Sequence, residues 1–192
     1  SFVDGTMVTL TAEPDASSVF TGWGGACSGT SPVCEVTITA ATAVTATFTL
    51  KTYTVTVTKA GAGAGTVAGN GINCGTGAGC TTTVDHGTAI SLTATPVSLN
   101  TFVGWGGACT GTGTCDLTIT ADTTISAAFA LDELSLIVTR GGNGAGTITS
   151  SPAGINCPGT CDFVFTANQM VTLTAAAAGS SNFMGWSGAC TG

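Results

Sequence analysis

Nine cysteines and a single histidine are the side chains of this sequence with the widest chemical range. A zinc site needs four thiolate or imidazole ligands that converge on one ion, and the one imidazole, His86, has no counterpart elsewhere in the chain. Many cysteines with almost no histidine are typical of disulfides in a protein exported to an oxidising compartment. We therefore predict structural disulfides, no metal site and no cofactor.

The cysteines fall into close pairs with three to six residues between the partners, and glycine, threonine, serine and proline fill most of the gaps. This spacing favours small disulfide loops and leaves Cys190 without a partner. Pairing of Cys74 or Cys80 with Cys109 or Cys115 stays open, because spacing alone does not settle connectivity. The predicted pairs are Cys27 with Cys34, Cys74 with Cys80, Cys109 with Cys115, and Cys157 with Cys161.

Catalytic groups are hard to assemble from this sequence. A serine, cysteine or threonine nucleophile needs a neighbouring base, but His86 stands alone and the cysteines are assigned to disulfides. The adjacent carboxylates Asp132 and Glu133 lie where we expect a solvated connection rather than an acid and base pair. The sequence therefore predicts a protein that is not an enzyme.

Charge and hydropathy exclude two classes of partner. The chain holds 3 Lys and Arg against 10 Asp and Glu, a formal net charge of −7, so it offers almost no cations to a phosphate backbone. Threonine, serine or glycine interrupts every apolar run well before the roughly 18 residues that a membrane-spanning helix requires. We predict neither nucleic-acid binding nor membrane insertion.

One internal repeat governs the organisation of the chain. The tryptophans at its three copies are 82 and 81 residues apart, and the sequences around them agree as well. A period of this length indicates an array of modules. The copies are GWGGACSG at 22–29, GWGGACTG at 104–111 and GWSGACTG at 185–192, preceded by GTMVTLTAEP at 5–14, GTAISLTATP at 87–96 and NQMVTLTAAA at 168–177.

The repeat divides the chain into one complete unit and two partial ones. Residues 51–131 form the complete repeat, residues 1–50 correspond to the C-terminal part of a unit, and residues 132–192 correspond to the N-terminal part. Because these limits do not fall at unit boundaries, we expect the sequence to be a segment of a longer array.

Alternation of apolar residues with threonine predicts antiparallel strands. In TYTVTVT at 52–58 one face is apolar and the other polar, as in a half-buried strand. The segment Ala175–Ala178 has high helix propensity, but the repeat aligns it with the end of a strand, and we follow the repeat. Further strands are expected at 65–68, 88–95, 101–105, 115–120 and 123–129. The predicted fold class is a tandem array of small all-β modules of about 81 residues, β-grasp- or sandwich-like.

Each tryptophan lies in the motif F-x-G-W-[GS]-G-A-C, and two interpretations of it stay open. The indole either packs against the neighbouring disulfide and closes a small core, or it lies exposed and stacks on a sugar ring. Near Trp105 only Asp116 offers the kind of polar group that usually accompanies a sugar. The candidate platform residues are Trp23, Trp105 and Trp186.

Threonine pairs spaced by one residue occur throughout, and β-propensity on a solvent-facing strand explains them most simply. A flat threonine array that orders water and dense O-glycosylation are the alternatives.

The complete repeat carries in order the motifs GINC, VDHGTAISLTATP, FVGWGGACTGTGTC and TISAAF. This series resembles the divergent internalin-B-type B-repeat family of bacterial surface and secreted proteins, over all of residues 51–131 and, as partial copies, nearly all of the remainder. The resemblance implies a small β-rich module used in tandem as a spacer, stalk or adhesive segment. It implies no catalytic residues.

These observations predict an extracellular or cell-surface structural protein of a bacterium. Its modules form a stalk or filament, and its partner is itself, through neighbouring modules or chains. A glycan-binding adhesin that uses the repeated tryptophan loops, with surface glycans as partners, is the alternative.

Overall fold

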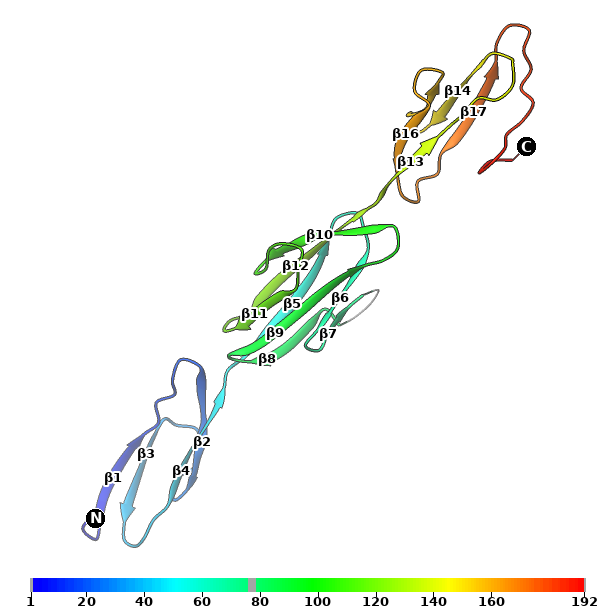
Figure 1. Ribbon diagram of the computed structural model, residues 1–192. Helices are drawn as coiled ribbons and strands as arrows, with labels where there is room; N and C mark the ends of the chain where they lie inside the picture. The colour runs from blue at the N-terminus through cyan, green and yellow to red at the C-terminus, as the bar shows by residue number, and fades with distance from the viewer. Residues whose placement is uncertain (1, 76–78, 192) are drawn as a thin grey trace. The chain divides into compact units, whose positions relative to one another are not determined.

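The computed structural model describes residues 2–75 and 79–191, whose strands are drawn in Figure 1. These residues form two compact units. The first unit holds nearly all of residues 2–129, and the second holds residues 130–191 with the short segments 62–64 and 97–101. Strands are the regular elements throughout the described residues, and no helix occurs among them. The prediction of an all-β fold with short-loop disulfides is confirmed.

The first unit begins with four strands that form two separate pairs. β1 (Thr6–Thr11) pairs antiparallel with β3 (Val33–Ile38), and β2 (Ser18–Gly25) pairs antiparallel with β4 (Val44–Leu50). Burial alternates along β1 and β3, so each strand has one half-buried and one exposed face. The period of two that the sequence predicted is therefore present in this partial repeat.

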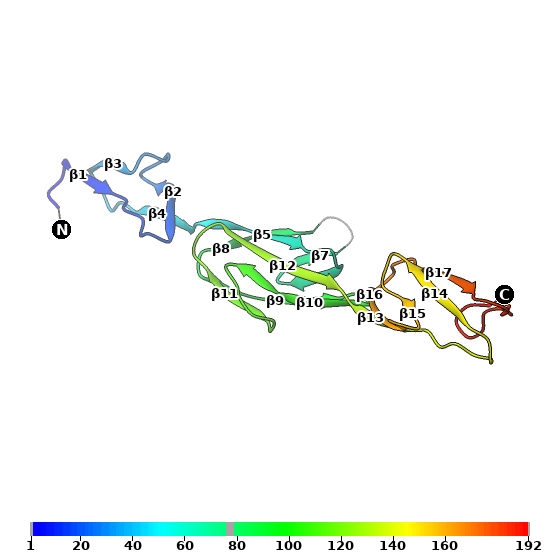
Figure 2. The same ribbon diagram turned by 90° about the horizontal axis from the view of Figure 1, so that it is seen from above.

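The complete repeat in the same unit forms two four-stranded sheets. Their orders are β10-β12-β5-β8 and β11-β9-β6-β7, seen from two directions in Figures 1 and 2. The predicted strands are found within two residues of their expected ends, whereas β7 and β8 were not expected. The eight strands are β5 (Thr52–Ala60), β6 (Gly65–Gly69), β7 (Ile72–Cys74), β8 (Thr81–Asp85), β9 (Thr88–Pro96), β10 (Asn100–Gly107), β11 (Cys115–Ile119) and β12 (Thr123–Leu131).

The core of this repeat lies between its two sheets. Alternate residues of β5 and β12 meet alternate residues of β6, β9 and β11 in one buried cluster, which is the arrangement of a β-sandwich. Phe129 is its largest fully buried side chain. Other members include Val55, Val57, Val67, Ile90, Leu92, Trp105, Ile119, Ile125 and Ala127.

One strand pair corrects the expectation that every pairing is antiparallel. β12 runs parallel to β5, with six residue pairs from Thr123 opposite Val55 to Ala128 opposite Ala60. The two strands are the first and the last of the repeat. A parallel pair needs a long crossover connection, and the six strands between β5 and β12 provide it.

The second unit contains five strands in two sheets. These are β13 (Glu133–Ile137), β14 (Gly146–Ser151), β15 (Asn156–Cys157), β16 (Asp162–Thr166) and β17 (Thr172–Ala177). β13 pairs with β16, and the other sheet has the order β15-β14-β17. Because β17 includes the first three of the four alanines at 175–178, the prediction from the repeat was right to overrule helix propensity.

Single residues connect consecutive repeats. Lys51 separates β4 from β5; its backbone N donates to Ser17 O at 2.8 Å, and its O accepts from His86 N at 2.7 Å. Asp132 separates β12 from β13 and makes the same two kinds of bond. The partners of Asp132 are Leu99 O at 3.0 Å and Ala167 N at 2.8 Å.

Candidate functional site

The tryptophan loop of the complete repeat joins the end of β10 to the disulfide that follows it. The backbone N of Trp105 donates to Gly111 O at 2.8 Å, and its indole Nε1 donates to Gly113 O at 2.7 Å. The ring meets Phe102 edge-on with centroids 5.1 Å apart, and it shares the core cluster with Cys109 and Cys115. Only 7% of Trp105 is exposed, which leaves too little indole face for a sugar to stack on.

The residue before this tryptophan must be glycine for a steric reason. Gly104 has φ +150°, and a Cβ built on it would lie 3.1 Å from Gly111 O, the atom that accepts the Trp105 backbone bond. Gly22, before Trp23, has the same conformation and the same close approach, to Gly29 O. The G-W dipeptide of the motif is therefore explained by backbone packing.

The other two tryptophans are less buried. Trp23 donates from Nε1 to Ser31 O at 2.8 Å and meets Phe20 edge-on at 5.2 Å. Trp186 packs against the core cluster of the second unit and meets Phe183 in the same geometry. Both indoles are half-buried. The contact between phenylalanine and tryptophan thus recurs in all three copies of the motif.

The disulfides join each close pair of cysteines and no others among the described residues. The pairs are Cys27–Cys34, Cys74–Cys80, Cys109–Cys115 and Cys157–Cys161. Cys190 is free and exposed. Each bond closes a loop of four to seven residues in sequence separation.

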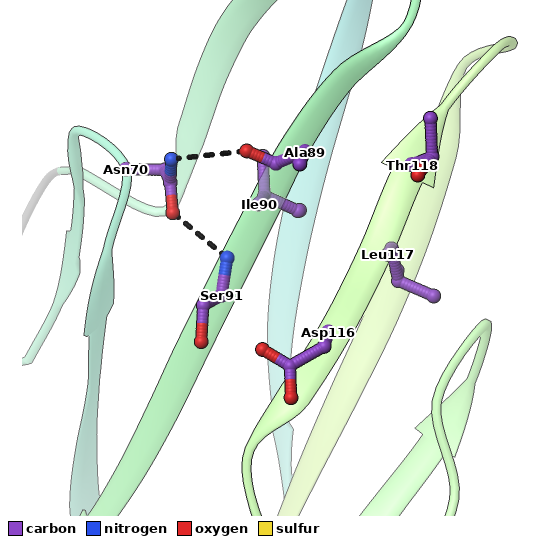
Figure 3. Close-up of a pocket in the computed structure, with 7 residues that line it drawn as sticks. All are labelled: Asn70, Ala89, Ile90, Ser91, Asp116, Leu117 and Thr118. Carbon is purple, nitrogen blue, oxygen red and sulfur yellow. Dashed lines mark hydrogen bonds between the residues drawn. The ribbon is translucent and has the colours of Figure 1, made fainter.

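A polar hollow of about 430 Å³ lies over β9 and β11 (Figure 3). Asn70, which follows β6 with φ +46°, accepts from Ser91 N at 2.8 Å through Oδ1 and donates from Nδ2 to Ala89 O at 3.4 Å. Ser91 lies opposite Asp116 in the antiparallel register. Ile90, Leu117 and Thr118 complete the lining.

Asp116 carries the charge of this hollow. Hydrogen bonds from the hydroxyls of Ser91 and then Thr114 lower the pKa of its carboxyl below the ordinary value. The Thr114 bond measures 2.7 Å. The hollow can accept hydrogen bonds from hydroxyl or amide donors, but its lining has no second titratable group for acid and base chemistry.

Sequence reasoning noted Asp116 only as a neighbour of the tryptophan loop, and it missed Asn70 and Ser91. The one available signal was the G-N-G sequence at 69–71, since asparagine between glycines often takes a positive φ. The hollow does not include Trp105, so the structure does not bring the predicted platform residue and the polar groups together.

Comparison with known protein families shows which family the chain is related to. The model of the divergent InlB B-repeat domain matches residues 1–52 and again residues 53–133. This chain belongs to that family. No curated protein and no solved structure matches it. The two B-repeat matches meet within two residues of the boundary that the internal repeat places after residue 50.

The groups that the sequence offered for catalysis have other neighbours in this B-repeat protein. The His86 ring lies beside Tyr53 with centroids 5.9 Å apart, and its Nδ1 is buried without a hydrogen-bond partner among the described residues. Asp132 Oδ1 accepts from Thr101 Oγ1 at 2.6 Å, and Glu133 is exposed at the start of β13. Within residues 2–75 and 79–191, no three His, Cys, Asp or Glu side chains cluster as metal ligands would.

The disulfides, together with membership of a bacterial surface-repeat family, suggest an extracellular or cell-surface location for this B-repeat protein. Among the described residues there is no helix with the length and hydrophobicity needed to span a membrane.

A second hollow, of about 310 Å³, opens into the apolar interior of the second unit. Leu134, Leu136, Phe165 and Leu173 line it, and exposed Cys190 lies at the same hollow. By the repeat alignment, Leu136 and Leu173 correspond to Val55 and Leu92 of the complete repeat, which are both 0% exposed. These equivalent positions are therefore closed in the complete repeat and line a hollow in the second unit. 

Proposed function

We propose that this chain is a non-enzymatic structural protein on the outside of a bacterial cell, where its B-repeats form a stalk or filament. The observation that carries the proposal is the complete repeat itself. Its core is filled by its own strands, two disulfides close short loops within it, and one residue at each end joins it to the next strand. Modules of this kind, joined in series, extend the chain away from the cell. They need few residues as linkers between the repeats.

Immunolabelling tests the location and the role together. An antibody raised against folded residues 51–131 should label intact cells that make the protein, and mild reduction followed by protease should remove the label. Labelling that requires permeabilised cells would contradict the proposal. An antibody against a cytosolic protein of the same cells is the control for integrity.

The partners that we propose are further modules or copies of the same chain, without a cofactor and without nucleic acid. With only 3 Lys and Arg the chain offers few cations to a phosphate backbone, and charged residues make up only 7% of it. Between weakly charged modules, electrostatic repulsion is small and apolar contact is the main source of attraction.

The filament version of the proposal is supported by the parallel strand pair of the complete repeat. β4 corresponds to β12, and β13 corresponds to β5, so the parallel pair of the complete repeat is a template for pairing β4 of one copy with β13 of another. Phe48 on β4 is 43% exposed, and the hollow beside Leu136 is apolar. An added strand of this kind continues a sheet through its free edge.

Sedimentation tests the filament version with the Cys190→Ser chain, which cannot form accidental disulfide dimers. Self-association should increase with concentration, and Leu136→Glu should reduce it by introducing a charge into the hollow. Met7→Glu is the matched control, because Met7 is 65% exposed and its equivalent in the complete repeat, Ala89, is exposed to solvent. A chain that stays monomeric at high concentration would exclude the filament and leave the stalk.

A glycan-binding adhesin remains the alternative, and it receives less support. Trp105 is buried, so binding would depend on Trp23 and Trp186, which are half-buried. Acrylamide quenching of variants that keep one tryptophan each separates the two functions. An indole at position 105 should resist quenching, and added oligosaccharide should leave all three spectra unchanged. A blue shift on adding a sugar would favour the adhesin.

A further inference from the structure

The first and last strands of the complete repeat are direct neighbours. β5 enters the repeat after Lys51, β12 leaves it before Asp132, and the two run parallel over six residue pairs. In a parallel pair the start of one strand and the end of the other lie at opposite ends of the ladder. Tension between the two ends of the repeat therefore pulls β5 and β12 along their own lengths in opposite directions.

This direction of pull loads the strand pair in shear. The hydrogen bonds of the six pairs share the load and must fail together, whereas an antiparallel hairpin pulled at its open end loses its bonds one at a time. β5 also pairs with β8, from Thr52 opposite Asp85 to Thr56 opposite Thr81, and that antiparallel pair offers the unzipping geometry within the same fold.

Side chains reinforce the parallel pair on both faces. On the inner face Val55, Ile125 and Phe129 are at most 1% exposed, so sliding of either strand would drag them out of the core. Two further hydrogen bonds connect the strands. Oδ1 of Asp122, the residue just before β12, accepts from Thr54 N at 2.8 Å, and Thr58 Oγ1 donates to Ile125 O at 3.3 Å. These contacts connect the same two strands that tension would separate.

We propose that the pair of β5 and β12 is a mechanical clamp that bears tension along an array of B-repeats. The inference rests on the proposed structural role and adds to it a load-bearing function with a defined site. Because one residue at each end joins the clamp strands to the neighbouring repeats, force reaches them without first straightening a loop. 

Single-molecule force spectroscopy on the full chain tests the clamp by changing only the direction of pull. Handles attached through Thr52→Cys and Glu133→Cys, in a Cys190→Ser background, load the clamp in shear. Handles through Thr52→Cys and Asp85→Cys unzip β5 from β8. All three handle positions are exposed. The unfolding force should be several-fold higher in shear than in unzipping, and equal forces would overturn the proposal.

The disulfides identify the event that belongs to the complete repeat. The closed loops 74–80 and 109–115 each hide six residues from extension in the shear geometry. At roughly 3.5 Å per residue, less the 4.4 and 5.7 Å that the two disulfides already span between Cα atoms, the length released should be about 30 Å longer after reduction than before. A high-force event whose released length does not change on reduction would not be the opening of the whole repeat and would count against the clamp.

Two proline variants separate the clamp from general stability. Thr54 N points toward β12. Backbone N–H groups point to alternate sides along a strand, so Thr58 N points the same way. Thr58→Pro therefore removes a hydrogen-bond donor from the clamp. Thr83 lies opposite Thr54 on the edge strand β8, and its N therefore faces away from β5, where proline is tolerated. The loss of unfolding force in the shear geometry should be at least twice as large for Thr58→Pro as for Thr83→Pro. Equal losses would overturn the clamp, and surface labelling would still decide the structural role.

Discussion

Residues 1–50 contain the equivalents of β9 to β12 of the complete repeat, yet only the complete repeat buries the inner faces of these strands. Phe129 of β12 is 1% exposed, whereas its equivalent Phe48 of β4 is 43% exposed. Ile125 is fully buried, and its equivalent Val44 is only half-buried. The difference lies in β5 to β8, which supply the facing half of the sandwich in the complete repeat, whereas residues 1–50 align only with the part of the repeat that follows them.

This contrast distinguishes strand pairing, which depends on local sequence, from burial of the strand faces, which depends on the whole repeat. Alternation and short disulfide loops are enough to pair β1 with β3 and β2 with β4. Exclusion of water from their inner faces requires strands that come from the other half of the repeat. Most of the hydrophobic stabilisation therefore belongs to pairings that are distant in sequence.

The largest effect should come from truncating the same aromatic residue in the two regions. Phe129→Ala should lower the free energy of unfolding of the complete repeat by about 3 to 5 kcal/mol, because it leaves a cavity in a filled core. Phe48→Ala should cost about 1 kcal/mol or less at its exposed site. Denaturant unfolding followed by hydrogen exchange in β5 measures the first loss, and equal losses would contradict the comparison.

Removal of a disulfide should have the next largest effect and should be similar in the two regions. Replacing Cys109 and Cys115 by serine opens a loop of sequence separation 6, and replacing Cys27 and Cys34 opens one of 7. If the bonds act by restricting the unfolded chain, each loss should be about 2 kcal/mol. The denaturant midpoints of the two double variants measure these losses. If burial of the sulfurs made the main contribution, the two midpoints would differ clearly.

A methyl group at Gly65 should cost somewhat less. A Cβ at this position would overlap the Phe129 ring in the complete repeat, so Gly65→Ala should destabilise by about 1 to 3 kcal/mol. Gly113→Ala is the matched control, since a Cβ there meets only open space. Thermal unfolding of the two variants measures the difference, and a stable Gly65→Ala protein would mean that the core has room to adjust.

The smallest effect concerns pH and the polar hollow. The lowered pKa of Asp116 means that its hydrogen bonds with Ser91 and Thr114 add stability above the ordinary carboxyl pKa. That contribution is lost as the pH falls through the lowered pKa. Asp116→Ala should therefore be slightly less stable than the parent at neutral pH, and the difference should vanish in acid. Unfolding midpoints measured across this range test it, and a constant difference would contradict it.

Much of the fold could be predicted because the repeat presents each weak sequence pattern more than once. The strand at 52–58 is clear from its alternation alone, while Ala175–Ala178 was assigned correctly only by comparison with its equivalents. The cysteine pairs were predictable because short loops leave few plausible partners. These are properties of local sequence, and three copies confirmed one another.

The features that escaped prediction depend on distant parts of the chain. Nothing in TYTVTVT indicates that its strand pairs in parallel with one that begins 71 residues later, at Thr123. β8, with its run of threonines, lacks the apolar alternation that marks a strand. The polar hollow needs Asn70 to reach across to Ser91, and this contact exists only after β6 and β9 have paired.

The short loops closed by the disulfides also bear on how such a chain matures. Eight cysteines can pair in on the order of 100 ways, and every wrong pair must be undone by thiol–disulfide exchange. Here every partner lies at most seven residues away, so the correct thiol meets its partner far more often than any competitor does. Each bond can form as soon as its own loop emerges, before the sandwich closes. Oxidative folding of a long array should then take no longer per repeat than that of a short one.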